Sequence, residues 1–190
     1  MKYLIYISLI LVFVSCDLFT SRDSEDPAGL RSNFNSPTTP EILFENLASS
    51  FNDKVIENYT ANFTDSMYLA KNFRFIPAAD AAGEFPQLAD WSLPDEKQYF
   101  TQLVSKVAAN QKLGLKLFFN EKTVYVDSAV YIYRYEISTN SDDENIPSFC
   151  SGTSQFTINV DRRNFWVISK WQDISDNKNR SWSYLKGKLY

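Results

Sequence analysis

Two patterns of hydrophobic positions divide the chain into a helical part and a part made of strands. Apolar residues recur at helical spacing after residue 39, and the period changes to two after residue 110. A spacing of three or four marks one face of a helix, whereas strict alternation marks a half-buried strand. Helices followed by consecutive antiparallel strands are typical of an α+β domain.

Three helices are predicted before the strands. The first begins at Thr39, whose side chain can cap it, and Pro40 follows in the first turn, where a missing N–H costs no hydrogen bond. The apolar stripe from Val55 to Phe63 predicts a second, shorter helix. A third helix is expected after Ser92, with an apolar face made of Tyr99, Phe100, Leu103, Val104, Val107 and Ala108.

Alternation of apolar residues predicts the strands. They are expected over residues 67–76, 113–119, 122–137, 155–160 and 166–171. On the longest, Tyr131, Tyr133, Tyr135 and Ile137 share one face, which we expect to pack on the core. A connecting loop is expected over 77–92, and a hairpin tip over 138–147.

Composition narrows the function. A chain of 190 residues with 4 Trp, 11 Tyr and 15 Phe can bury a large core. The net charge of −4 argues against a protein that binds nucleic acid, because such binding requires a basic surface. The chain has no histidine and only two cysteines, so no metal site and no cofactor is predicted.

The first sixteen residues look like an export signal. Lys2 precedes an apolar run, residues 4–14, which is too short to span a bilayer. The run ends in Ser15-Cys16, which resembles the lipobox of bacterial lipoproteins, although Phe13 departs from the usual Leu. The resemblance implies cleavage before Cys16 and lipidation of its sulfur. An ordinary cleaved signal peptide and an uncleaved anchor are the alternatives.

This interpretation sets the expected domain organisation and location. Residues 1–15 are the predicted lipoprotein signal peptide, residues 16–38 the lipidated cysteine and a flexible tether, and residues 39–190 a single α+β domain. Lipidation of Cys16 leaves Cys150 without a disulfide partner. We expect a protein of the bacterial cell envelope that is held to the inner or outer membrane by its lipid.

The order of elements resembles the nuclear transport factor two-like superfamily, which includes ketosteroid isomerase. Phe63 and Asp65 fall where many members have an aromatic residue followed by Asp. The end of the chain, Phe156-x-Ile158 and then Trp166-x-Ile168-x-x-Trp171-x-Asp173, is similar to the last hairpin of the family. The resemblance implies three N-terminal helices packed on a strongly curved antiparallel sheet, a cone with a pocket at its open end. A cystatin-like or a lipocalin-like domain is the alternative.

The resemblance does not carry a catalytic set. Enzymatic members place a carboxylate, often with Tyr or His, in the pocket, but the matching positions fall near Ala70 or Lys71 and near Glu45 or Asn46.

Other residues on the strands and helices could form a site of their own. Asp173 is the candidate for a catalytic base, because a carboxylate among aromatic rings has a raised pKa. Tyr59, Tyr133 and Trp171 are the candidates for binding a ligand. The alternative is that Asp173 lies at a solvated strand end and that the tyrosines are packing residues.

The predicted function is therefore a non-catalytic module that binds a small hydrophobic ligand or an envelope protein. The alternative is an isomerase-like or dehydratase-like enzyme that uses a pocket carboxylate.

Charged segments add little to this picture. The acidic residues 142–144 lack the spacing of a calcium loop and are expected to be solvated. Lys178, Arg180, Lys186 and Lys188 are expected to solvate a C-terminal tail, which Trp182 and Tyr184 dock on the domain.

Overall fold

The computed structural model describes residues 33–190, which belong to one compact unit. The predicted signal peptide, the lipidation site Cys16 and residues 17–32 of the predicted tether lie outside the described residues. Residues 33–38, the last part of that tether, lie along the domain. Asn35 exchanges two hydrogen bonds with the side chain of Asn46, and the carbonyl of Pro37 accepts from the backbone N–H of Trp166.

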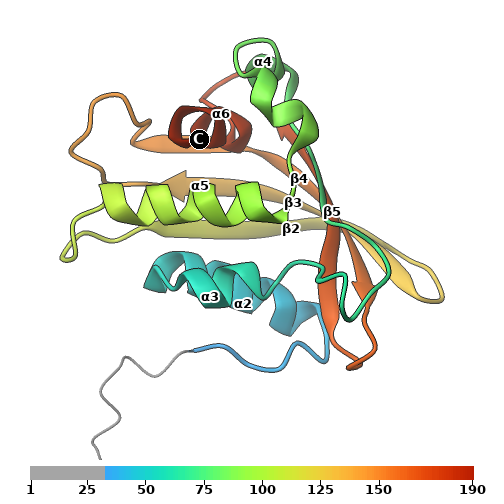
Figure 1. Cartoon of the computed structure of the whole chain (residues 1–190). Coiled ribbons are helices and arrows are strands. Elements are labelled where there is room, and N and C mark those ends of the chain that lie inside the picture. The colour runs from blue at the N-terminus through green and yellow to red at the C-terminus, as the bar shows by residue number, and fades with distance from the viewer. Residues whose placement is uncertain (1–32) are drawn as a thin grey trace, which may run out of the picture. The chain divides into compact units, whose positions relative to one another are not determined.

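One five-stranded sheet organises the domain, in the order β1-β5-β4-β3-β2. Its strands are β1 (Arg74–Ile76), β2 (Gly114–Val124), β3 (Ser128–Ser138), β4 (Phe149–Val160) and β5 (Trp166–Ser175). The last four pair antiparallel, as the alternation predicts, whereas the short β1 pairs with β5 in parallel. The sheet curls around the helices, which lie across its inner face (Figure 1).

The helices come from both ends of the domain. They are α2 (Pro40–Asp53), α3 (Ile56–Thr60), α4 (Ala79–Ala82), the 3-10 helix η2 (Pro86–Asp90), α5 (Leu93–Lys106) and α6 (Trp182–Leu189). The three predicted helices are α2, α3 and α5. None of the helices between residues 33 and 190 has the length and apolar character needed to cross a membrane.

The predicted helix starts are confirmed. Thr39 caps α2, where its hydroxyl accepts a hydrogen bond from the N–H of Ile42 at 3.4 Å. Ser92 and Asp95 form a capping box at the start of α5, in which the Asp95 carboxylate accepts from the Ser92 backbone N–H at 2.8 Å. Local sequence therefore fixes where the two long helices begin.

The core lies between the helices and the concave face of the sheet. Tyr131, Tyr133, Tyr135 and Ile137 of β3 are buried on that face, as predicted. Phe44 of α2 packs on Tyr133 with ring centroids 4.6 Å apart, and Trp171 of β5 packs edge-on to Trp182 of α6 at 4.3 Å. Aromatic pairs at such distances stabilise a fold beyond simple burial.

Two of the predicted strands have different boundaries. In the predicted strand 67–76, only Arg74–Ile76 is a strand, because Asp65 closes a turn by accepting from the N–H of Met67. The strand predicted over 122–137 is two strands. A bulge between Phe119 and Glu121 lets β2 continue to Val124, so the hairpin turns at residues 125–127.

The structure also extends the prediction at two places. β4 begins at Phe149, six residues before the expected start, and the predicted loop 77–92 contains the short helices α4 and η2. The expected C-terminal tail is the helix α6, in which every residue except Lys188 is buried. Trp182 and Tyr184 dock it, as predicted, but the prediction that Lys186 is solvated is wrong.

Gly187 tests how tightly α6 is packed. A Cβ atom at Gly187 would collide with the ring of Phe85, whereas one at Gly83, which ends α4, would meet nothing within 4 Å. We expect Gly187→Ala to lower the free energy of unfolding by about 1–3 kcal/mol through overpacking. Gly83→Ala, the matched control, should leave it unchanged or raise it by about 0.5 kcal/mol. Urea unfolding measures both, and equal values for the two variants would contradict the packing of α6.

Candidate functional site

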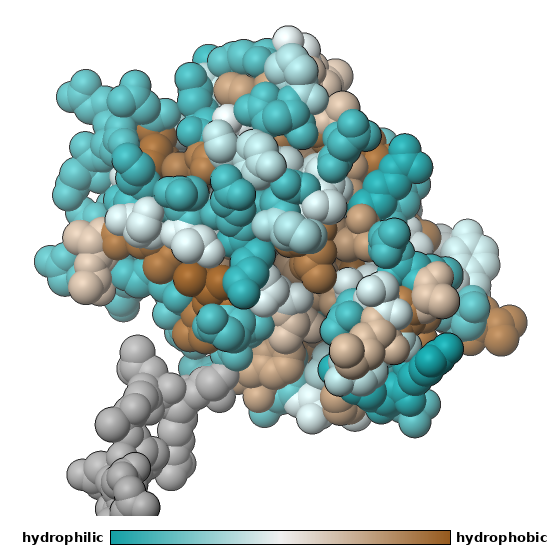
Figure 2. Space-filling view, in the orientation of Figure 1, coloured by the Kyte–Doolittle hydropathy of each residue, from teal (hydrophilic) through white to brown (hydrophobic). Residues whose placement is uncertain are grey.

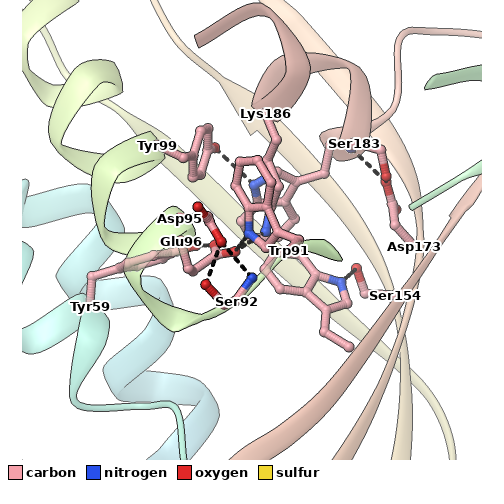
Figure 3. Close-up of polar contacts among 12 residues, drawn as sticks. Tyr59, Trp91, Ser92, Asp95, Glu96, Tyr99, Ser154, Asp173, Ser183 and Lys186 are labelled. Carbon is pink, nitrogen blue, oxygen red and sulfur yellow. Dashed lines mark hydrogen bonds and ion pairs between the residues drawn. The ribbon is translucent and has the colours of Figure 1, made fainter. Parts of the chain in front are cut away.

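A buried ion pair joins α6 to α5 in the interior of the domain (Figure 3). The ammonium of Lys186 donates to Oε2 of Glu96, and neither side chain has any exposed surface. The two residues are 90 positions apart in the sequence. A charge buried in this way is stable only where a partner and further hydrogen bonds replace the lost water.

The Glu96 carboxylate has two further donors. The hydroxyl of Tyr59, on α3, donates to Oε1 at 2.6 Å, and the indole N–H of Trp91 donates to Oε2 at 2.7 Å. These contacts come from three different segments of the chain. Glu96 of α5 therefore holds α3, α6 and Trp91, the residue that follows η2, together.

Aromatic rings surround the Lys186 ammonium. Its Nζ lies 3.8 Å from the ring centroid of Trp171 and 3.9 Å from that of Phe75, with Tyr99 at 5.3 Å and Trp91 at 5.5 Å. The faces of such rings attract a cation, most strongly where water is excluded. Lys186 is thus the cation of an aromatic cage that the protein itself fills.

Asp173 of β5 forms a second buried contact with α6. Its Oδ2 accepts from the backbone N–H of Ser183 at 2.7 Å and from the Ser183 hydroxyl at 2.6 Å. Its Oδ1 accepts from the hydroxyl of Tyr135 at 2.9 Å. The Tyr135 hydroxyl oxygen in turn accepts from the backbone N–H of Trp182 at 2.7 Å. Asp173 therefore satisfies donors in the first turn of α6.

Burial dominates the electrostatics of these groups. It raises the pKa of Asp173, while the hydrogen bonds from Ser183 and Tyr135 oppose that shift. Burial lowers the pKa of the Lys186 ammonium to about 8, against the attraction of Glu96. The pKa of the Tyr59 hydroxyl is raised well above its usual value, first by burial and then by the charge of Glu96.

The predicted ligand-binding residues do not share one open pocket. Tyr59 donates to Glu96, and the indole of Trp171 donates to the Ser154 hydroxyl at 3.0 Å while its ring faces Lys186. Tyr133 lies apart from them, between Phe44 and Phe119. Each of the three is a buried packing residue in this structure, and a role in binding stays a prediction.

The candidate base Asp173 is also closed off. It is buried, so the alternative of a solvated strand end does not hold, and protein donors occupy both of its oxygens. It lies beside Tyr135, not beside the predicted partners Tyr59 and Tyr133. Catalysis at Asp173 would require α6 to move.

Lys186 and Glu96 were not among the residues predicted from the sequence. Glu96 follows Pro94-Asp95 in the first turn of α5. Acidic side chains in a first turn normally stabilise the N-terminus of the helix while they remain in solvent. Lys186 is one of four cations in what looked like a polar tail. Its only signal is position: Trp182, Leu185, Lys186 and Leu189 have the spacing of one helical face, which places Lys186 among apolar residues.

A cleft with a volume of about 530 Å³ lies on the surface of the domain. It lies between α3, the start of α5 and the turn between β4 and β5. Phe63, Leu93, Ala61 and Pro94 give it apolar walls, and its charged and polar lining residues are Glu57, Thr60, Asp65, Lys97 and Arg163. The size is that of a small-molecule site.

Nothing in the described part of the chain gathers three or more potential metal-ligating side chains of His, Cys, Asp or Glu. In the acidic loop, Asp142 accepts from the side chain of Gln111 at 2.9 Å, and Asp143 pairs with Lys106 at 3.3 Å. The hydrogen bonds from Asn145 and Lys106 hold the pKa of Asp143 below its usual value.

Replacing Lys186 tests the ion pair. Lys186→Met keeps the length of the side chain but removes every N–H donor that this side chain offers to Glu96, whereas a deprotonated lysine would still donate to that carboxylate. The Glu96 charge is then buried without a partner at this position, so we expect a loss of about 3–5 kcal/mol of stability. Adding Glu96→Gln removes that charge, and the double variant should be more stable than Lys186→Met alone. Chemical unfolding of the three proteins gives the comparison. A double variant less stable than the single one would show that the charge on Glu96 is not the source of the loss.

The lowered pKa of Lys186 also predicts a pH dependence. Between pH 8 and pH 9.5 the unfolded lysine, with a pKa of 10.5, keeps its proton, whereas the folded one releases it. Because the unfolded state then binds more protons, stability should rise with pH over this window, by about 1 kcal/mol per pH unit. Unfolding curves of the wild type and of the Glu96→Gln/Lys186→Met variant measure it. An equal slope in both proteins would contradict the assignment to Lys186.

Comparison with solved structures places the domain among known folds. Comparison of the sequence with family models and with curated proteins finds no match. In structure, the chain is similar to a protein from Novosphingobium aromaticivorans provisionally named an aromatic ring hydroxylase, with a TM-score of 0.56 and 10% identity over 80% of this chain and 96% of that one.

Two further structures carry the family name. One is a protein from Streptomyces avermitilis provisionally named a dehydratase of the NTF2-like family, with a TM-score of 0.50 and 7% identity over 71% of this chain and 91% of that one. The other is a nuclear transport factor 2 superfamily protein from Salmonella enterica, with a TM-score of 0.50 and 12% identity over 69% of this chain and 84% of that one. These likenesses, together with the curled sheet and its covering helices, confirm the predicted fold class. The domain has the nuclear transport factor two-like fold.

Proposed function

We propose that the protein is a lipid-anchored lipoprotein of the bacterial cell envelope whose domain binds a partner without catalysing a reaction. The partner is a small hydrophobic ligand, and its binding site is the surface cleft between α3 and α5. The membrane is reached through the lipid on Cys16. An envelope protein that covers the same cleft is the second form of this proposal.

One observation carries the non-catalytic part. The resemblance to ketosteroid isomerase implies a pocket inside the cone, but in this chain α6 packs both on α5 and on the inner face of the sheet, where Trp182 contacts Tyr135 and Trp171. Lys186 and Glu96 have no exposed surface, and Trp171 and Trp182 are also fully buried. A substrate could reach these groups only by displacing α6, which would leave two buried charges without partners.

The cleft supports binding at the outside of the domain. The side chains of Leu93, Pro94 and Ala61 offer apolar contact above the buried Phe63, and charges of both signs lie around them. Arg163 already pairs with Asp161 at 2.6 Å and stacks on Tyr68 at 3.9 Å, whereas the side chain of Lys97 is exposed on the opposite wall. An apolar ligand with one acidic group would match this wall by contacting Leu93 and pairing with Lys97.

Two observations favour the enzymatic alternative. Burial raises the pKa of Asp173, and a carboxylate with a raised pKa next to a tyrosine hydroxyl is a usable general acid or base. Two of the structurally similar proteins are provisionally named as enzymes, a hydroxylase and a dehydratase. This alternative needs an open state in which Ser183 leaves Asp173.

Native mass spectrometry of the protein extracted gently from its own envelope tests both parts of the proposal. We expect the wild type to carry the mass of acyl chains and an additional ligand of a few hundred daltons. Cys16→Ser should lose the acyl mass, and Ala61→Phe, which fills the cleft, should lose the ligand mass. Each substitution should leave the other mass in place.

Matched variants serve as controls. Cys150→Ala changes the other cysteine, and Ala109→Phe adds the same ring at an exposed alanine that does not line the cleft. Both should keep the acyl and the ligand mass. Acyl mass retained in Cys16→Ser would overturn the anchor. The enzymatic alternative would be favoured by a different result. In that case Ala61→Phe keeps the ligand, whereas Asp173→Asn loses both the ligand and the conversion of that ligand to a product.

A further inference from the structure

Exposed apolar side chains are concentrated on the β2–β3 hairpin. Val126 is fully exposed, and Val124, Tyr125 and Phe119 are exposed by 64%, 58% and 57%. Phe118 lies next to them, with 39% of its surface exposed. A soluble domain normally buries residues of this kind, and a group of them marks a surface of interaction.

The outer part of β2 and the turn that follows it, residues 118–127, form an exposed arm. Every residue of this arm is exposed, whereas Ala129 and Tyr131 of the paired strand β3 are buried. Figure 1 shows the arm extending beyond the helices, and Figure 2 shows hydrophobic surface at its outer end. The tip consists of Val124, Tyr125 and Val126, and the chain turns back there through a hydrogen bond from the N–H of Tyr125 to the carbonyl of Ser128.

The edge of the arm does not suit pairing with a second copy of the chain. β2 is the last strand of the sheet, but a bulge at Phe119/Glu121 interrupts its register. Lys116, Glu121 and Lys122 place charges along the same edge, and both devices oppose edge-to-edge pairing. A stable dimer also needs about 800 Å² from each partner, which a tip of three side chains cannot supply.

We propose that this tip inserts shallowly into the interfacial layer of the bilayer that carries the lipid anchor. A bilayer accepts a convex apolar tip without a complementary groove, and a tyrosine with its hydroxyl in the headgroup layer suits the interface. Glu121 and Asp127 offset Lys122 near the tip. The contact is therefore apolar in origin and does not require anionic lipid.

The chain outside the described residues is long enough for this contact. Sixteen residues, 17–32, separate Cys16 from Asn33. Asn33 hydrogen-bonds Asp53 at the end of α2, and the neighbouring Asn52 accepts from the N–H of Leu115 at the start of β2, so the tether joins the domain near the base of that strand. Sixteen residues can span at most about 55 Å, whereas the eleven residues of β2 span about 36 Å. The lipid and the tip can thus reach the same bilayer. The inference rests on the proposed anchor, which keeps the tip at a high local concentration near the membrane.

A fluorescent label at the tip tests the contact in the lipidated full chain. In Val126→Cys, position 126 provides the accessible thiol, because the lipid occupies Cys16 and Cys150 is buried. The NBD-labelled protein is reconstituted in vesicles of phosphatidylcholine, and separately of phosphatidylethanolamine with phosphatidylglycerol. We expect a blue shift and a rise in emission in both, with quenching by nitroxide-labelled acyl chains. The same label at Gln102→Cys, exposed on α5, should show none of these.

Two substitutions sharpen the result. Val124→Ser with Tyr125→Ser should reduce quenching at position 126 about tenfold. Ile174→Ser changes an exposed apolar residue near the end of β5 and should leave the quenching unchanged.

The outcomes separate the tip from the anchor. Flotation of the vesicles reports the anchor alone, so a protein that does not float points to failure of the proposed function. A protein that floats while the label at position 126 stays unquenched overturns the membrane contact. A response only when a second protein is added, or one that grows with protein concentration in the absence of vesicles, overturns it in favour of a protein partner or a second copy.

Discussion

The ion pair between Glu96 and Lys186 is the constraint on which the rest of the interior depends. Two opposite charges without any exposed surface cost several kcal/mol each in lost hydration, and the cost is offset only where every lone pair and proton finds a partner. Tyr59 and Trp91 supply donors to Glu96, and the rings of Phe75 and Trp171 face the ammonium. These residues come from α3, from β1 and β5, and from the residues before α5. The pair therefore ties together elements that are far apart in the sequence.

With the pair in place, the interior of the domain is filled by side chains and not open to solvent. α6 occupies the space beside the concave face of the sheet, and Asp173 holds its first turn through Ser183. In the function proposed above, recognition therefore takes place on the outside of the domain. The cleft beside Phe63 and the apolar tip at Val126 are the two surface features proposed for it, and they can be changed independently.

Local signals in the sequence predicted most of the framework. Thr39 and Ser92 mark helix starts because a cap is a matter of three or four neighbouring residues, and the buried face of β3 follows from alternation alone. The misplaced β2–β3 turn has a local cause of another kind, because a bulge at Asn120 shifts the alternation by one residue while the strand continues. The parallel pairing of β1 with β5 joins residues 96 positions apart and has no such local signal.

The buried ion pair was harder to predict because its two residues are far apart in the sequence. A lysine in a C-terminal stretch with other cations is normally solvated, and only a carboxylate 90 residues earlier makes its burial possible. Asp173 and Trp171 were singled out from the last strand, but their roles depend on α6, whose helical period is short and mixed with polar residues.

The interior and the surface of α5 are linked by two adjacent residues. Glu96 points inward to Lys186, and its neighbour Lys97 is exposed beside the cleft. Because consecutive helical residues point in directions about 100° apart, fixing Glu96 also fixes the direction of Lys97. Leu93 and Pro94, one turn earlier, form the cleft wall, and the capping box of Ser92 and Asp95 holds that turn. The buried pair thus sets the geometry of the cleft without lining it, and the rigidity of the interior gives the external site its shape.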